Sequence, residues 1–132
     1  MAINDSLVIP ATLADAHGES AFIADETFTI PTGITNGDQI SLWEAPGTIV
    51  VGTAYVTTSG TLGASVTLRL RKRDKDDNTT NLAPATTAGS ANTKVSDAPF
   101  VLVSGDTLEA VVGGADTSTE ADVTLTLVAH RK

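Results

Sequence analysis

The sequence contains no cysteine, few aromatic residues and few basic ones. Without cysteine, neither disulfides nor thiolate metal sites can stabilise the fold. Lys and Arg number 8 against 16 for Asp and Glu, and the formal net charge is −8. This deficit of cations argues against a nucleic-acid partner, because phosphate contacts depend on Lys and Arg. Aromatic residues make up 4% of the chain, so a core must be built mainly from aliphatic side chains.

Long hydrophobic runs are also missing. No apolar segment approaches the ~20 residues needed to cross a bilayer. The first five residues, Met1 to Asp5, lack the basic start and the apolar stretch of a signal peptide. We therefore expect no membrane partner, and synthesis and folding in a cytoplasm. At 132 residues the chain is long enough for one domain with a sizeable core.

Short segments in which apolar and polar residues alternate follow one another from residue 22 onward, separated by Gly, Pro and Asn turns. They are 22–30, 38–43, 48–58, 65–73, 100–103, 106–112 and 122–129. The apolar run in 48–58 is nearly continuous and predicts a central strand covered on both faces, with a bulge at Gly52. Seven or eight strands without helical periodicity predict an all-β, single-domain antiparallel sandwich or barrel, and within that class a jelly roll.

Two segments do not fit the strand pattern. Residues 1–20 predict an extended N-terminal arm, which leaves 21–132 as the β-sandwich domain. Residues 78–97 form a long connection poor in large apolar side chains. Connections of this length are usually functional or disordered, and we expect it to touch a partner or to cross between two sheets, with a small strand near Thr86. A Gly-Asp pair precedes two of the predicted strands, at Gly37 and at Gly105. This repetition would fit a domain built from two similar halves, and it would equally arise by chance.

Positive charge is concentrated in one segment, Ser65–Asp77. Alternation predicts that Leu68 and Leu70 face the core while Arg69 and Arg71 face solvent. Outside residues 69–77 there are 13 acidic residues (16 less three) against 3 basic ones (8 less five), so an acidic partner or a second copy of the chain would complement this segment. The alternative is a solvated strand end neutralised by its own aspartates. The residues expected at a partner contact are Arg69, Arg71, Arg73, Lys75, Asp76, Trp43 and Tyr55.

The end of the same segment has the oxygen spacing of a calcium loop. The four candidate ligands are Asp74, Asp76, Asn78 and Thr80. Thr79 stands where such a loop needs glycine, and Ala85 stands where it needs a bidentate glutamate. An exposed hairpin tip made soluble by charge is therefore favoured over a metal site, and we expect no cofactor.

No arrangement of residues indicates catalysis. His17 and His130 are the only histidines and lie far apart in the sequence, and no Gly-x-Ser-x-Gly motif surrounds a serine. The scattered carboxylates predict a solvated surface rather than an acid/base pair; they are Glu19, Asp25, Glu26, Glu44, Glu109 and Glu120. We expect no catalytic residue and no enzymatic activity.

The strand segments Gly37–Val56, Val66–Leu70, Gly105–Leu108 and Val123–Val128 share one style, rich in Ala, Thr and Gly and opened by Gly-Asp turns. In this the chain resembles small structural proteins of tailed bacteriophages. The resemblance implies a non-enzymatic capsid decoration (cement) protein on the capsid surface of the virion, which binds the shell of major capsid protein and stabilises the head. Edge strands and an arm favour a homo-oligomer, a dimer or trimer. The alternative is a receptor- or glycan-binding knob of a head or tail fibre, with Trp43 or Tyr55 as a stacking platform.

Overall fold

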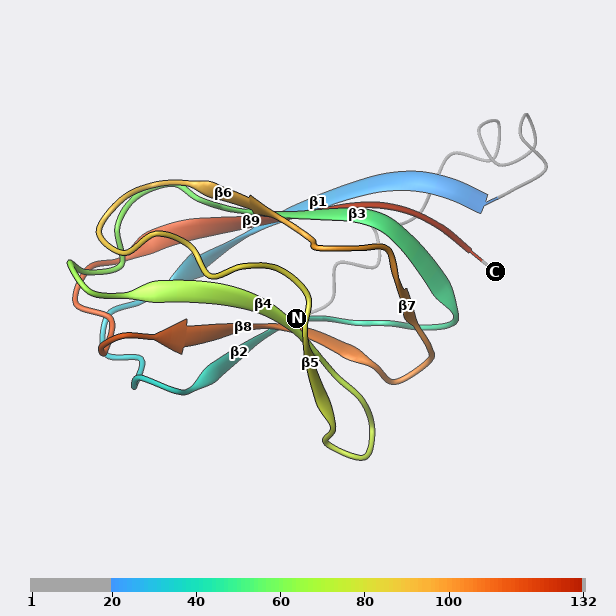
Figure 1. The fold of residues 1–132 in the computed structure, drawn as a ribbon, viewed down its shortest axis with the longest axis horizontal. Helices are drawn as coiled ribbons and strands as arrows, with labels where there is room; N and C mark the ends of the chain where they lie inside the picture. The colour runs from blue at the N-terminus through green and yellow to red at the C-terminus, as the bar shows by residue number, and fades with distance from the viewer. Residues whose placement is uncertain (1–19, 132) are drawn as a thin grey trace.

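The computed structural model describes residues 20–131, and the side chains from residue 23 onward. The predicted arm, residues 1–20, lies outside this range except for Ser20, where the first strand begins. Within the described range the chain forms nine β-strands and no helix (Figure 1). They are β1 (Ser20–Ile30), β2 (Gln39–Glu44), β3 (Ile49–Thr58), β4 (Thr67–Arg73), β5 (Thr79–Asn81), β6 (Thr93–Val95), β7 (Phe100–Leu102), β8 (Thr107–Gly113) and β9 (Ala121–Arg131).

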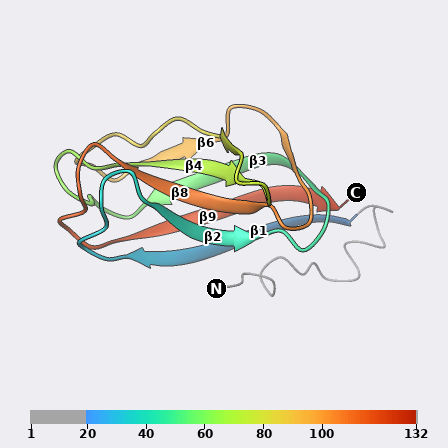
Figure 2. The ribbon, with the colours of Figure 1, turned by 90° about the horizontal axis from the view of Figure 1, so that it is seen from below.

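The strands form two sheets that pack face to face (Figures 1 and 2). Sheet A has the order β1-β9-β3-β6, with β7 also paired to β3, and sheet B has the order β2-β8-β4-β5. Every pairing is antiparallel. The strands pair from the two ends of the chain inward, as β1·β9, β2·β8, β3·β6 and β4·β5. Two further pairings, β9·β3 and β8·β4, join these pairs into the two sheets. This is the strand order of a jelly roll, as the sequence predicted.

The core is aliphatic and follows the predicted alternation. Val123, Leu125 and Leu127 of β9 in sheet A are fully buried, and they belong to the same core as Leu68 and Leu70 of β4 in sheet B. Burial of such side chains is worth about 1.5–3 kcal/mol each. The alternation along the strands therefore builds the buried layer between the two sheets.

Strand β3 differs from the prediction that both its faces are covered. Val51, Ala54 and Val56 are buried, but Thr53 is only half-buried and Tyr55 is 37% exposed. The predicted bulge at Gly52 is present, since the register between β3 and β9 shifts between Val51 and Thr53. The bulge shifts the alternation by one residue, so the inward residues on its two sides, Val51 and Ala54, are three positions apart. The apolar residues therefore look continuous in the sequence, although the outer face of β3 is partly exposed to solvent.

The connection 78–97 crosses between the sheets, one of its two predicted roles. Leu82 and Thr86 donate backbone N–H groups to the carbonyls of Leu70 (3.0 Å) and Leu68 (2.8 Å), so the segment runs along the free edge of β4. The Thr86 hydroxyl in turn accepts from the Leu68 N–H at 2.8 Å. Asp97 then donates to the Leu82 carbonyl at 2.8 Å, close to β6 of sheet A. The segment closes one side of the sandwich, and its buried side chains add to the core.

Candidate functional site

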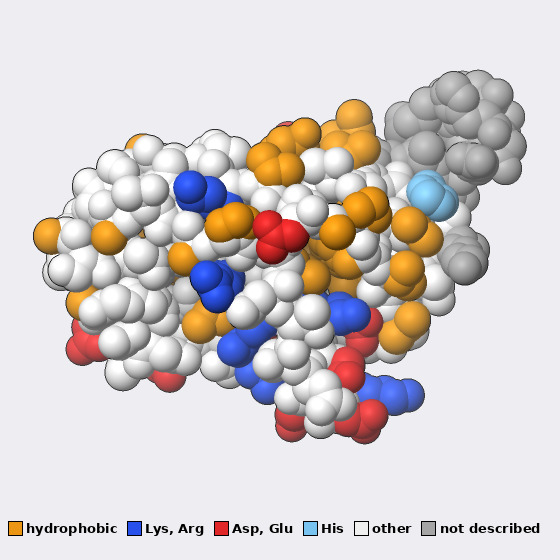
Figure 3. All heavy atoms as spheres, in the orientation of Figure 1, with side chains coloured by type: hydrophobic (Ala, Val, Ile, Leu, Met, Phe, Trp, Pro, Cys, Tyr) orange, Lys and Arg blue, Asp and Glu red, His pale blue; other side chains and the backbone are white. Residues whose placement is uncertain are grey.

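The basic residues of β4 lie on the outer face of sheet B. Because Leu68 and Leu70 point into the core, the alternate residues Arg69, Arg71 and Arg73 point away from it. Figure 3 shows Lys and Arg side chains gathered beside the β4–β5 hairpin, with acidic side chains at its tip. The predicted concentration of positive charge is thus present on one surface.

Glu109 of β8 lies in the middle of these arginines. The cross-strand register places it directly opposite Arg71. The Nε of Arg71 donates to Oε2 of Glu109 at 2.8 Å, and the Nη2 of Arg71 forms an ion pair with the same oxygen. The Nε of Arg73 donates to Oε1 at 2.8 Å. Glu109 is only 1% exposed, so the prediction that it is a solvated surface carboxylate is wrong.

The pKa values show which charges this cluster favours. Burial alone would raise the pKa of Glu109, but the hydrogen bonds from Arg73 and Arg71 outweigh burial, and the pKa lies below its usual value. The hydrogen bond to Glu109 likewise raises the pKa of Arg73. Glu109 is therefore charged at neutral pH, and through its ion pairs it neutralises part of the positive charge that the sequence assigned to the surface.

Among the three arginines of this face, Arg69 is the one that forms no ion pair with a described residue. Its Nε is buried and has no hydrogen-bond partner among the described residues. Its cross-strand neighbour is Val111, which has no charge to offer. Because Arg69 is only half-buried, the exposed part of its side chain could bind a carboxylate of another molecule, whereas its buried Nε could not. Arg71 and Arg73, also predicted contact residues, instead hold Glu109.

The tip of the β4–β5 hairpin is built around Asp74. Its Oδ1 accepts the backbone N–H groups of Asp76 and Asn78, both at 2.9 Å, and its Oδ2 accepts the Asn78 side-chain amide at 3.2 Å. The Asn78 backbone hydrogen bond is the main reason that the pKa of Asp74 is lowered. The backbone of Asp77 has a positive φ of 65°. Its Oδ1 lies 3.6 Å from Nη1 of Arg73 and forms an ion pair with it. Among the described residues no three His, Cys, Asp or Glu side chains form a metal-binding group, and the oxygens of Asp74 serve the turn.

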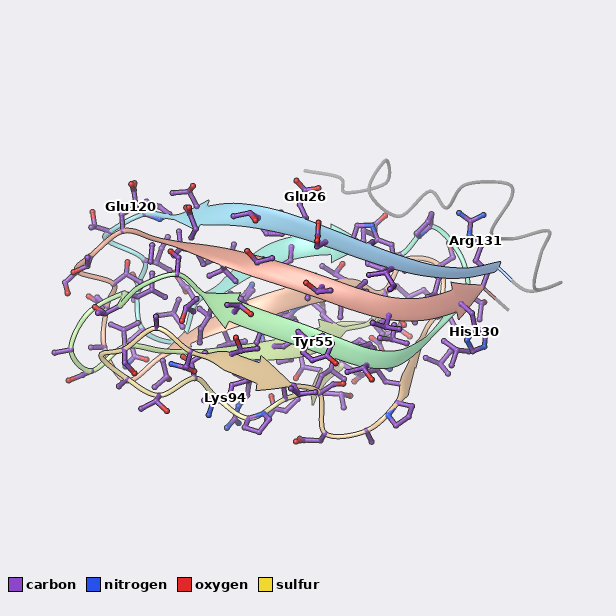
Figure 4. The ribbon with its side chains drawn as sticks, turned by 90° about the horizontal axis from the view of Figure 1, so that it is seen from above. Glu26, Tyr55, Lys94, Glu120, His130 and Arg131 are labelled. Carbon is purple, nitrogen blue, oxygen red and sulfur yellow. The ribbon has the colours of Figure 1, made fainter. Side chains whose placement is uncertain are left out.

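Two of the remaining predicted contact residues, Trp43 and Tyr55, do not join this surface. Trp43 is 1% exposed because a bulge in β2, between Ser41 and Trp43, turns both Leu42 and Trp43 into the core. It has no exposed ring to offer a partner. Tyr55 lies on β3, on the outer face of sheet A (Figure 4). Lys75 and Asp76 are exposed at the hairpin tip. The structure thus brings Arg69, Arg71 and Arg73 together and separates Tyr55 from them by the thickness of the sandwich.

His130, near the end of β9 beside Arg131 (Figure 4), belongs to no cluster of acidic or metal-binding side chains among the described residues. A hollow of ≈ 310 Å³ is lined by residues 46–49 and Arg131, which supplies its one ionisable side chain. In residues 20–131 there is also no helix of the length and hydrophobicity required to span a bilayer.

The same fold occurs in chains of three bacteriophage capsid structures. The TM-score is 0.60 with a chain of the cyanophage Pam1 capsid asymmetric unit, at 16% identity over 86% of each chain. It is 0.54 with a chain of the capsid of Ralstonia phage GP4, at 18% identity over 84% of this chain and 85% of the other. It is 0.52 with a chain of the acidic stable capsid structure of Helicobacter pylori bacteriophage KHP30, at 15% identity over 83% and 86%. Neither a protein-family model nor a protein of curated function matches the sequence.

Proposed function

We propose that this protein is a non-enzymatic decoration (cement) protein of a bacteriophage head, located on the capsid surface of the virion. The observation that carries the proposal is the likeness to chains of three phage capsids, each matched over more than four-fifths of both chains. In each case the match extends over most of the other chain as well as most of this one.

The charged cluster supports a structural role rather than chemistry. A catalytic carboxylate needs access to a substrate, whereas Glu109 is buried beneath Arg71 and Arg73. Its oxygens are all used by these two guanidinium groups. The cluster stabilises the outer face of sheet B and leaves Arg69 as the group available to a partner.

The proposed partner is the shell of major capsid protein, and the proposed contact is the outer face of sheet B around Arg69. Arginine is well suited to hold a carboxylate of a neighbouring protein at an interface. Binding that occurs only on the assembled shell stabilises the shell by mass action. No enzymatic step is needed for this function.

Cosedimentation with purified capsids tests the proposal directly. The protein is added to capsids that lack it, and the pellet is assayed for stoichiometric, saturable binding. We expect saturation at a fixed ratio of protein to capsid subunit, together with a higher melting temperature of the shell. Absence of the protein from the pellet at all concentrations would refute the proposal.

A receptor- or glycan-binding knob remains the second candidate, because Tyr55 is 37% exposed beside Val95, which is 43% exposed. An exposed aromatic ring next to an apolar side chain is a possible platform for a sugar. The burial of Trp43 removes the other aromatic candidate. A glycan-array signal that is lost in Tyr55→Ala would favour this function, and an array without signal would argue against it.

A further inference from the structure

The two sheets have four edges, and three of them are protected against pairing with another chain. Edge strands expose unpaired N–H and C=O groups, and proteins blunt them with short strands, proline, bulges or covering segments. On one side of sheet A, β6 and β7 have three residues each and Pro99 precedes β7. In sheet B, β5 also has three residues, and β2 carries the bulge between Ser41 and Trp43.

The fourth edge is β1, and among the described residues it has no proline, no bulge and no covering segment. Its charged residues are Asp25 and Glu26. Its 11 residues pair with β9 in an unbroken register, from Ser20 opposite Arg131 to Ile30 opposite Ala121. Within residues 20–131 no strand pairs with its other side, and Figure 4 shows β1 as the outermost strand of sheet A. It contains no proline, lysine or arginine. This edge is long and regular, and no described strand lies beside it; such an edge is the kind that accepts another strand.

The apolar surface of this strand leads to the same conclusion. Ile23 is 70% exposed, the highest value among the large hydrophobic side chains of the described residues. It lies on the outer face of sheet A opposite Val128, which is 38% exposed. An isolated exposed apolar residue needs no explanation, but one placed on the unprotected edge would be covered by a paired strand.

We propose that β1 pairs antiparallel with β1 of a second copy of this chain, about a twofold axis at Ile23, so that two copies of sheet A become one continuous sheet. A second copy suits this edge, because antiparallel pairing brings the same strand against itself and makes the contact closed and self-complementary. This inference does not depend on the proposed capsid partner.

The charges of β1 select the register. A twofold axis at Asp25 would place two copies of this carboxylate directly opposite each other, which is unfavourable. With the axis at Ile23, Asp25 is opposite position 21 of the second copy and Glu26 is opposite position 20. An axis at Thr27 also separates the carboxylates but leaves Ile23 uncovered beyond the paired region. Of the three outward positions compared, Ile23, Asp25 and Thr27, the axis at Ile23 is the one that satisfies both conditions.

The absence of cysteine from the sequence allows a direct test. Single cysteines are introduced in the full chain at the outward positions of β1, as Ile23→Cys, Asp25→Cys, Thr27→Cys and Thr29→Cys. Only a residue on the twofold axis meets its own copy, at a Cα separation of about 4.5–5.5 Å, which a disulfide can bridge. We expect a disulfide-linked dimer from Ile23→Cys after mild oxidation and none from the other three. A dimer from Thr27→Cys instead would overturn the register.

Val128→Cys is the matched control, because Val128 lies beside Ile23 on the same face but one strand in from the edge. Equal cross-linking of Val128→Cys and Ile23→Cys would show face-to-face contact and overturn the edge pairing. A full-length chain that sediments as a monomer and gives no Ile23→Cys dimer would also overturn it, and would mean that residues before Ser20 or another protein cover the edge.

A lysine substitution tests the same edge without oxidation. Ile23→Lys places a charge of the kind that blunts natural edge strands, and since Ile23 is mostly exposed the monomer should stay folded. We expect the dissociation constant of the dimer to rise by at least about tenfold, equivalent to about 1.4 kcal/mol, in sedimentation equilibrium. Val128→Lys should change it less. Equal dimer affinity in wild type and Ile23→Lys would contradict the proposal.

Discussion

Glu109 lies on the outer face of a sheet, where a carboxylate ordinarily meets water, and yet it is 1% exposed. Two arginines from the neighbouring strand cover it and donate hydrogen bonds to both of its oxygens. A buried charge is tolerated only when such partners are present, because desolvation costs several kcal/mol per ion. Breaking the cluster by removing Glu109 should therefore cost far more than removing an ordinary surface carboxylate.

Glu109→Ala is expected to lower the free energy of unfolding by about 3 kcal/mol, because it leaves two partly buried guanidinium groups without their acceptor. Urea denaturation monitored by tryptophan fluorescence measures it, since Trp43 is a buried reporter and the sole tryptophan. Glu44→Ala, an exposed carboxylate on β2 of the same sheet, is the control and should change stability by less than about 0.5 kcal/mol. Equal effects would show that the cluster contributes nothing.

The lowered pKa of Glu109 also predicts how stability depends on pH. Its pKa in the folded protein is below its pKa in the unfolded chain, about 4.3. Its stabilising contribution is thus fully present above about pH 5, and is lost as the pH falls through 4 toward the folded pKa. Denaturation at pH 7, 5 and 3 should show that the free energy of unfolding of the wild type falls between pH 5 and pH 3, and that it falls less in Glu109→Gln. Parallel curves for the two proteins would contradict this assignment.

At the scale of the strands and turns, the two Gly-Asp pairs of the sequence hold equivalent places. Gly37 precedes β2 and donates its N–H to the Val112 carbonyl of β8, while Gly105 precedes β8 and donates to the Ala45 carbonyl just after β2. Each turn is thus fixed to the far end of the other strand in one antiparallel pair. Both glycines have a positive φ, 95° and 92°, a conformation that other residues adopt at a cost.

Gly105→Ala should therefore lower the free energy of unfolding by about 1–3 kcal/mol. No atom lies within 4 Å of the position that the new methyl group would take, so the cost comes from the backbone alone. Gly60→Ala is the matched control, because its surroundings are equally open and its φ is not in the positive range. Thermal unfolding of both variants by circular dichroism checks this, and an unchanged melting temperature in Gly105→Ala would contradict it.

Seven of the nine strands could be predicted from alternation, because burial of one face of each strand leaves a period of two in the sequence. The other two, β5 and β6, lie in the segment 78–97 that was predicted as a connection, and the small strand expected near Thr86 is absent from the described structure. The contacts between strands could not. Alternation placed Arg71 and Glu109 on outer faces, but only the register of β4 and β8 brings them together. Bulges caused the other errors: the one in β2 turns Trp43 inward, and the one at Gly52 hid the exposed face of β3. The glycine itself indicated the bulge at Gly52, whereas the bulge in β2 has no such signal in the sequence.

At the scale of the whole molecule, the free positive charge is smaller than the sequence suggested. Five basic residues fall within residues 69–75 of the sequence, but Glu109 engages Arg71 and Arg73, and Asp77 also lies near Arg73. Arg69 is half-buried and forms no ion pair among the described residues. If the outer face of sheet B is the capsid contact, its affinity should thus depend on Arg69 more than on the total charge of the segment.

Arg69→Gln removes this charge without placing a new carboxylate next to Arg71. It should weaken capsid binding in the cosedimentation assay by about 1.5–3 kcal/mol, the range for hydrogen bonds to charged groups, or about ten- to a hundredfold in Kd. Lys94→Gln changes the net charge equally but lies on β6 of sheet A, so it should bind almost as tightly as wild type. Equal losses would point to long-range attraction by net charge, which salt screens. A loss in Arg69→Gln that persists at high ionic strength would instead identify a specific, partly buried contact on the outer face of sheet B.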